Sequence, residues 1–478
     1  MEKTHVPTVY LATSNFFKNG RLSSEDNGVP TLRIIAVPQN YYSERLSRER
    51  AKPVAAAAFD QVVDALIRPV TSQEANPVVK PAAKVNIKVS GESLAVALEN
   101  FNDLFLKNHW SDGLPVMPPT PERVKWMLTG TDRSPAEKLG LVDPRRGIAT
   151  VENVAINAVM AGAKPEYLPV ILAAMECLLD ERFTHFHFLT SAGDFNLVIT
   201  VSGPIVKELG MNSGLGYLSY GSRPNSTIGR AVRLALINLG HLWPAENDMA
   251  LVGRASPHTF LVIAENEDSN RWGPYHVSQG FKPGDSCVSV DVINGHTGGL
   301  GSPNVYGGGA VAVVPPEMIL DQILRELSRD RGQVIGSGGA AVSMYGNSFQ
   351  RHIIVFNPDI AQELKSRLGY TRESLIQYLY DKSSVPFENL QPAEIASVQK
   401  AIASGYIPRD RVAAFQDGLK PGGKVPLLLR PEDLHVIVAG DMPGYTLTMS
   451  GYSRAIDPTQ TRPLAHNTKL VRSRAANY

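Results

Sequence analysis

Apolar residues follow two different spacings along this chain. Some lie in short, nearly continuous runs typical of strands, and others repeat every three to four residues as on a helix face. Strands are expected over 9–13, 32–37, 196–202, 259–264, 286–292, 353–356 and 434–440. Helices are expected over 55–67, 91–108, 150–160, 165–179, 227–239 and 317–330. The alternation of strand and helix predicts a mixed α/β fold.

Local composition divides the chain into four parts. Residues 1–70 form a small α/β unit that is short for an independent domain, and residues 71–90 have the proline and small residues of a linker. Residues 91–456 form a larger α/β catalytic or binding domain. Residues 457–478 form a basic, polar tail, which we expect to be loose or to lie on a neighbour.

Global composition excludes several classes of protein. A net charge of +1 gives no general attraction to nucleic acid or to membranes. No apolar run approaches the roughly 18 residues of a membrane helix, and the first residues lack an apolar signal segment. Only Cys177 and Cys287 are present, which excludes a disulfide scaffold. We therefore expect a cytoplasmic protein in which both cysteines are structural.

A glycine-rich loop that leads into a helix is the strongest ligand signal. It runs from Asn212 to Arg233, with glycines that let backbone N–H groups face a ligand. Asn225, Ser226 or Thr227 is expected to cap the helix, whose start attracts anions. The residues expected to contact a carboxylate or phosphate here are Asn212, Ser213, Arg223, Asn225, Thr227 and Arg230.

Two histidines in the sequence Thr-His-Phe-His-Phe are the first candidates for metal binding or catalysis. His185 and His187 are two residues apart, so on a strand they would share one face. Asp194 or Glu265 would complete a divalent metal site, and either histidine suits general base catalysis.

Glu265 follows the expected strand at 259–264, and polar groups at strand ends are common in α/β active sites. Glu265 and Glu267 would share a face if the strand continued. Trp272 and His276 follow closely. Trp272 is expected to line the substrate pocket, and His276 to protonate the substrate. These residues are the second candidate group for acid–base catalysis. The alternative interpretation of Trp272 and His276 is a packed aromatic loop without a catalytic role.

Four long stretches of this chain resemble the UGSC-like family of proteins. They are Trp110–Val116 with the following Pro-Pro-Thr, 149–170, 225–234, and 264–281 with its Glu-Asn-Glu and Trp-Gly-Pro-Tyr-His-Val motifs. The resemblance extends over roughly residues 90–310. It implies functional roles for Trp110 and Asp112, which otherwise read as a turn between helices.

The N-terminal unit resembles the back half of the small UGSC domain, which is similar to part of the selenoprotein B subunit of glycine reductase. The selenocysteine- or Cys-Gly-Ser-Cys motif of that domain is absent here, because no cysteine precedes Cys177. Thiol or selenol chemistry would then come from a partner subunit, or the chemistry differs.

These observations predict a cytosolic enzyme that acts on a small anionic molecule, with redox or C–X bond cleavage as the reaction implied by the family. The first alternative is a metal-dependent lyase or hydrolase. The second is a non-catalytic subunit that partners a thiol-bearing protein. A divalent metal is the possible cofactor, since no dinucleotide fingerprint occurs. A homo-oligomer is expected, without nucleic acid or membrane partners.

Overall fold

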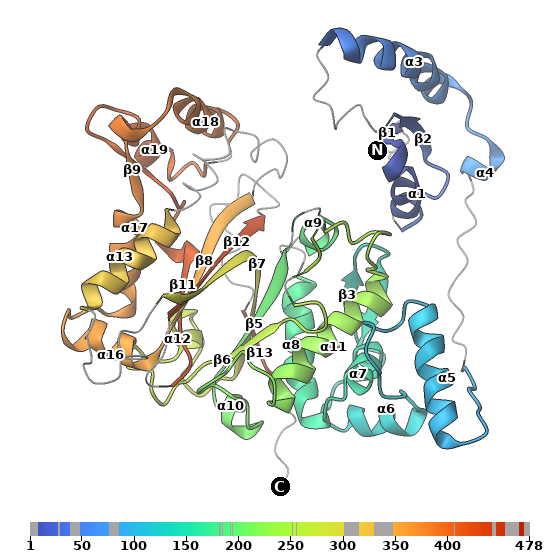
Figure 1. Ribbon diagram of the computed structural model, residues 1–478, viewed down its shortest axis with the longest axis horizontal. Helices are drawn as coiled ribbons and strands as arrows, with labels where there is room; N and C mark the ends of the chain where they lie inside the picture. The colour runs from blue at the N-terminus through green and yellow to red at the C-terminus, as the bar shows by residue number, and fades with distance from the viewer. Residues whose placement is uncertain are drawn as a thin grey trace, which may run out of the picture.

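In the computed structural model the chain folds as a mixed α/β protein built around one large sheet (Figure 1). The structure describes residues 8–26, 29–38, 48–75, 86–180, 183, 185–191, 193, 195–250, 252–254, 256–300, 315–328, 348–405, 407–441, 446–454 and 468–472. Helices cover both sides of the sheet, as the alternating sequence pattern predicts.

The N-terminal unit contains a parallel pair of strands with helices beside it. Its elements are β1 (Val9–Thr13), η2 (Ser14–Phe16), α1 (Phe17–Asp26), β2 (Arg33–Val37), α3 (Arg48–Ile67) and α4 (Ser72–Ala75). The guanidinium of Arg33 donates to both carboxylate oxygens of Glu74, at 2.8 and 3.0 Å. This pair ties α4 to β2, so the contacts of the unit extend past residue 70.

The large sheet has the strand order β11-β8-β12-β7-β5-β6, and a short strand, β13, also pairs with β7. Its strands are β5 (Asn196–Ser202), β6 (Leu261–Ala264), β7 (Cys287–Leu300), β8 (Ser348–Phe356), β11 (Leu434–Val438), β12 (Thr446–Arg454) and β13 (Thr468–Leu470). The pairs β5–β6 and β11–β8 are parallel, and the other pairs are antiparallel. Because β13 belongs to the tail, that part of the tail is anchored in the sheet.

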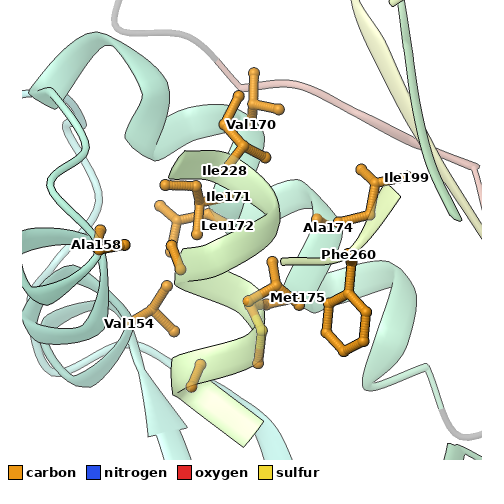
Figure 2. Close-up of a cluster of buried hydrophobic side chains, with 14 of the residues drawn as sticks. Val154, Ala158, Val170, Ile171, Leu172, Ala174, Met175, Ile199, Ile228 and Phe260 are labelled. Carbon is orange, nitrogen blue, oxygen red and sulfur yellow. The ribbon is translucent and has the colours of Figure 1, made fainter. Parts of the chain in front are cut away.

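One side of the sheet carries the largest apolar core. Three helices dominate it: α7 (Val151–Met160), α8 (Leu168–Leu178) and α11 (Arg223–Gly240). Figure 2 shows Leu172 and Met175 of α8 packed between α7, α11 and the sheet. The other elements of this half are α5 (Leu94–Lys107), α6 (Pro121–Leu128), β3 (Lys138–Val142), β4 (Gly147–Thr150), η3 (Pro165–Tyr167), α9 (His185–Thr190), α10 (Ile205–Glu208) and α12 (Tyr275–Ser278).

The C-terminal half adds two smaller cores. One packs α13 (Pro316–Leu327), α16 (Pro358–Ser366) and α17 (Arg372–Lys382) against β8 and β11. The other joins β9 (Ser384–Pro386), η4 (Phe387–Asn389), α18 (Pro392–Ala403), α19 (Val412–Gly418) and β10 (Lys424–Pro426). The 3-10 helix η5 (Pro431–Asp433) leads directly into β11.

The two strands at the ends of the sheet order, β11 and β6, meet at their carboxyl ends. The N–H of Asn266, just after β6, donates to the carbonyl of Val438 at the end of β11, at 2.8 Å. A fourth apolar cluster joins the strands of this sheet, and it includes Val198 of β5 and Ile437 of β11. The meeting point places the loop after β6 beside the loop after β11.

Several expectations need correction. Residues 185–190 form helix α9, whereas the pairing of His185 with His187 presumed a strand. Helix α11 begins at Arg223, before the expected caps, and Ser222 stands at its N-cap without a side-chain cap. Of the apolar side chains of α5 only Phe101 is buried, and Leu94 is 78% exposed. Among the described residues, no helix combines the length and apolarity needed to cross a membrane.

Candidate functional site

The chain directly after β6 places a carboxyl group inside the protein. The N–H of Glu265 continues the sheet by donating to Val201 O at 2.9 Å, and its side chain is fully buried. Both carboxyl oxygens accept the N–H of Tyr275 at 2.8 Å, and one also accepts from Asn270 Nδ2 at 2.7 Å. Glu265 therefore lies under the loop that runs from β6 to α12.

Arg372, the first residue of α17, closes this loop from the other side. Its guanidinium donates to Gly273 O at 2.7 Å and to Pro274 O at 3.1 Å. It lies 3.7 Å from a carboxyl oxygen of Glu265, within ion-pair range but too long for a hydrogen bond. Burial raises the pKa of Glu265 to about 8, although Arg372 and the N–H of Tyr275 act in the opposite direction.

Glu267 and His276 meet beside Glu265. Nδ1 of His276 lies 3.4 Å from a carboxylate oxygen of Glu267. The imidazole is fully buried, whereas the Glu267 side chain is 22% exposed and gives the group its contact with solvent. One oxygen or nitrogen from each of Glu265, Glu267 and His276 lies within 4.8 Å of the others. We call these three residues the carboxylate–histidine centre.

A glycine at the end of β5 supports this centre. Gly203 has a φ of 97°, and its N–H donates to Glu267 at 2.5 Å. A Cβ at this position would lie 2.2 Å from the carbonyl oxygen of Asp285. Only glycine has both the positive φ and the small size that this close approach needs, so the fold requires glycine at position 203.

The glycine-rich segment that starts at Asn212 lies against the same strand ends. The N–H of Gly440 donates to Ser213 O at 2.8 Å, and the Asn266 side chain donates to Gly440 O at 2.9 Å. Asn266 is the residue after Glu265. The structure thus brings the predicted anion-binding loop and the predicted acid–base segment together.

Asn225 holds this loop in shape instead of capping the helix. Its amide accepts from Asn212 N and donates to Asn212 O, both at 3.0 Å, and the residue is buried. The predicted cap at Asn225 is wrong because its side chain satisfies loop backbone groups. The hydroxyl of Thr227 donates to Arg223 O one turn earlier, at 2.8 Å.

The arginines of this segment bind other parts of the protein. Arg223 donates twice to Gly162 O, at 2.8 and 3.0 Å. Arg230 forms a bidentate pair with the buried carboxylate of Asp112, at 2.8 and 2.9 Å. Arg233 lies over the ring of Phe260 with 3.9 Å between guanidinium carbon and centroid, and burial lowers its pKa to about 10. These contacts join α11 to its surroundings.

The two tryptophans pack at different places. Trp110 lies edge-on to Phe105, with ring centroids 5.3 Å apart. Trp272 packs edge-on against Phe356 at 5.4 Å, and its indole N–H donates to Tyr370 O at 2.9 Å. Trp272 lies on the loop over Glu265, whereas Trp110 precedes the Asp112–Arg230 pair.

The geometric argument for a histidine pair on one strand face does not hold. His185 and His187 belong to helix α9, on which residues two apart do not face each other. Their side chains, and the whole of Asp194, lie outside the described residues.

Sequence reasoning found Glu265 and His276 but named Glu267 only on the premise that β6 continues. The strand ends at Ala264, and Glu267 reaches the centre through the following turn. Arg372 and Asn270 were not predicted. Arg372 is about a hundred residues away in sequence, and no local pattern indicates its contact with the loop after β6.

Comparison with known proteins leaves the family open. No family model, no curated protein and no solved structure matches this chain. The resemblance to the UGSC-like family stays a prediction.

Proposed function

We propose that this chain is an enzyme that acts on a small anionic molecule, a carboxylate or a phosphate, by proton transfer at the carboxylate–histidine centre. The observation that carries the proposal is the convergence of two carboxyl groups and one imidazole at the ends of β5 and β6. Groups of these types are the usual general acids and bases, and strand ends are the usual place for them in α/β proteins.

The exposure of the three side chains assigns their roles. Glu267 is the member that meets solvent, so it exchanges the proton with the substrate. His276 lies behind it, with Nδ1 3.4 Å from the Glu267 carboxylate. Glu265 is a positioning residue, because its oxygens hold the N–H of Tyr275 and the side chain of Asn270.

The predicted anion site lies beside this centre through the contacts of Gly440 with Ser213 and Asn266. Helix α11 starts there without a side-chain cap, and the start of a helix favours negative charge. Arg223 and Arg230 already have protein partners, so we assign the loop backbone the larger share of anion binding.

Acid–base chemistry of a lyase or hydrolase suits this chain better than thiol redox chemistry. Cys177 and Cys287 are its only cysteines, and both are buried. Burial raises the pKa of Cys177 well above its usual value and that of Cys287 to about 12. A thiol with a raised pKa and no access to solvent is a poor nucleophile and a poor redox group.

The test is turnover of a panel of small carboxylic acids, keto acids and phosphate esters, followed by proton and phosphorus NMR. For any substrate that the wild-type chain converts, we expect Glu267→Gln to lower kcat/KM by about 10²-fold or more, as loss of a general acid or base does. Asp268→Asn is the matched control, because that neighbouring carboxylate is 69% exposed and lies outside the centre.

Turnover by Glu267→Gln at the wild-type rate would overturn the proposed role of the centre. Absence of turnover over the whole panel, together with co-purification of a thiol-bearing protein, would instead support the non-catalytic subunit.

A further inference from the structure

The nitrogen of His276 that faces Glu267 has no hydrogen-bond partner. The other ring nitrogen, Nε2, lies 3.1 Å from the carbonyl oxygen of Lys282. A carbonyl only accepts, so Nε2 carries the ring proton and the neutral imidazole has its lone pair on Nδ1. Nδ1 is buried and unpartnered.

Nδ1 lies beside another electron-rich atom. The carboxylate oxygen of Glu267 that lies 3.4 Å away already accepts the N–H of Gly203. A lone pair and a carboxylate oxygen at this distance repel each other unless a positive charge lies between or beside them. A carboxyl oxygen of Glu265 completes the triangle within 4.8 Å.

The contacts around these three residues are those of metal ligands. A histidine ligand commonly donates its other ring N–H to a backbone carbonyl, as His276 does to Lys282, and ligating carboxylates are themselves hydrogen-bonded, as Glu265 is by Tyr275 and Asn270. Among the described residues, Glu265 Oε1 accepts from both Asn270 and Tyr275, whereas Oε2 accepts only the shared N–H of Tyr275 and Glu267 Oε1 only that of Gly203, so these two oxygens each keep a lone pair for a further bond.

We propose that Glu265, Glu267 and His276 bind one divalent cation of the manganese or zinc class. One imidazole nitrogen and two carboxylate oxygens suit such borderline cations better than calcium, which takes six to eight oxygens. Ligand atoms bound at about 2.1 Å lie about 3–3.5 Å apart. The Glu267 oxygen and His276 Nδ1, 3.4 Å apart, already have this spacing, and binding requires the three ligand atoms, now within 4.8 Å of one another, to draw closer around the ion.

This inference deepens the proposed function, because three protein ligands leave a coordination position open for water or an anionic substrate. It assigns the centre a cation that would attract the carboxylate or phosphate. Arg372 lies 3.7 Å from Glu265 but gives its hydrogen bonds to Gly273 O and Pro274 O.

Calorimetric titration of the full chain, stripped with EDTA, with Mn²⁺ and with Zn²⁺ tests the inference. We expect one ion per chain for the wild type. Glu267→Gln and His276→Gln are each expected to weaken binding at least about tenfold, the loss that removal of a mere supporting partner causes. Asp268→Asn, which changes an exposed neighbouring carboxylate, is expected to bind as the wild type does.

Electron spin-echo spectroscopy of the Mn²⁺-loaded wild type removes any dependence on variant folding, because an imidazole nitrogen bound to manganese gives a direct nuclear coupling. Absence of stoichiometric binding, absence of that coupling, or equal binding by all variants would overturn the inference. Turnover that depends on Glu267 but persists in the EDTA-stripped chain would overturn the metal site and leave the proposed function intact. Metal binding at the centre without any turnover would support the metal site and overturn the proposed function.

Discussion

Replacement of Asp112 by alanine is expected to lower the free energy of unfolding by about 3–5 kcal/mol, the usual cost of removing one partner of a buried ion pair. The Asp112 side chain is 1% exposed and that of Arg230 is 18% exposed. Without Asp112, Arg230 keeps a carbonyl contact with Pro115 but loses the bidentate carboxylate. Equilibrium unfolding in urea measures the change.

The exposed pair of Lys207 and Asp268 is the matched control for Asp112. Both of its side chains are 69% exposed, so Asp268→Asn is expected to change stability by no more than about 1 kcal/mol. Equal, small effects of Asp112→Ala and Asp268→Asn would show that Arg230 is not held by Asp112. Arg230 would then be available to an anion, as the sequence predicted.

The second large effect is expected at Phe260, directly before β6. Phe260→Ala is expected to cost about 3–5 kcal/mol, because it leaves a cavity in the largest core. It also removes the ring beneath the buried guanidinium of Arg233, which keeps its bond to Ser256 O at 2.8 Å. Thermal or urea unfolding measures the loss.

Phe59 provides the control for Phe260 with the same change of side chain. It lies on α3 and is 64% exposed, so Phe59→Ala is expected to change stability by no more than about 0.5 kcal/mol. A loss at Phe260 no greater than that at Phe59 would contradict the packing of α11 against this ring.

Local sequence signals predicted most of the elements that carry the fold. Thr120 before Pro121 and Thr150 before Val151 cap α6 and α7, because a hydroxyl next to a helix start satisfies a free N–H wherever the helix packs. The same reasoning failed at Asn225, whose amide bonds a loop distant from its own helix turn. A cap is a local interaction, but tertiary packing determines whether a polar side chain caps its own helix or bonds to a loop.

The segment at His185 shows a second limit. Alternation over Thr-His-Phe-His-Phe is too short to separate a strand from one turn of helix, and Phe188 and Leu189 are both buried in α9. The end of a buried strand is easier to locate in the sequence, and the polar residue that follows the strand at 259–264 is Glu265. The contact of Arg372 with Glu265 depends on how distant elements pack, which no spacing in the sequence records.

Anomalous diffraction from crystals of the chain grown with Mn²⁺ would show directly whether the carboxylate–histidine centre binds a cation. We expect one anomalous peak at about 2.0–2.3 Å from His276 Nδ1 and from oxygens of Glu265 and Glu267. Full-occupancy manganese elsewhere, with His276 Nδ1 hydrogen-bonded directly to Glu267, would contradict it.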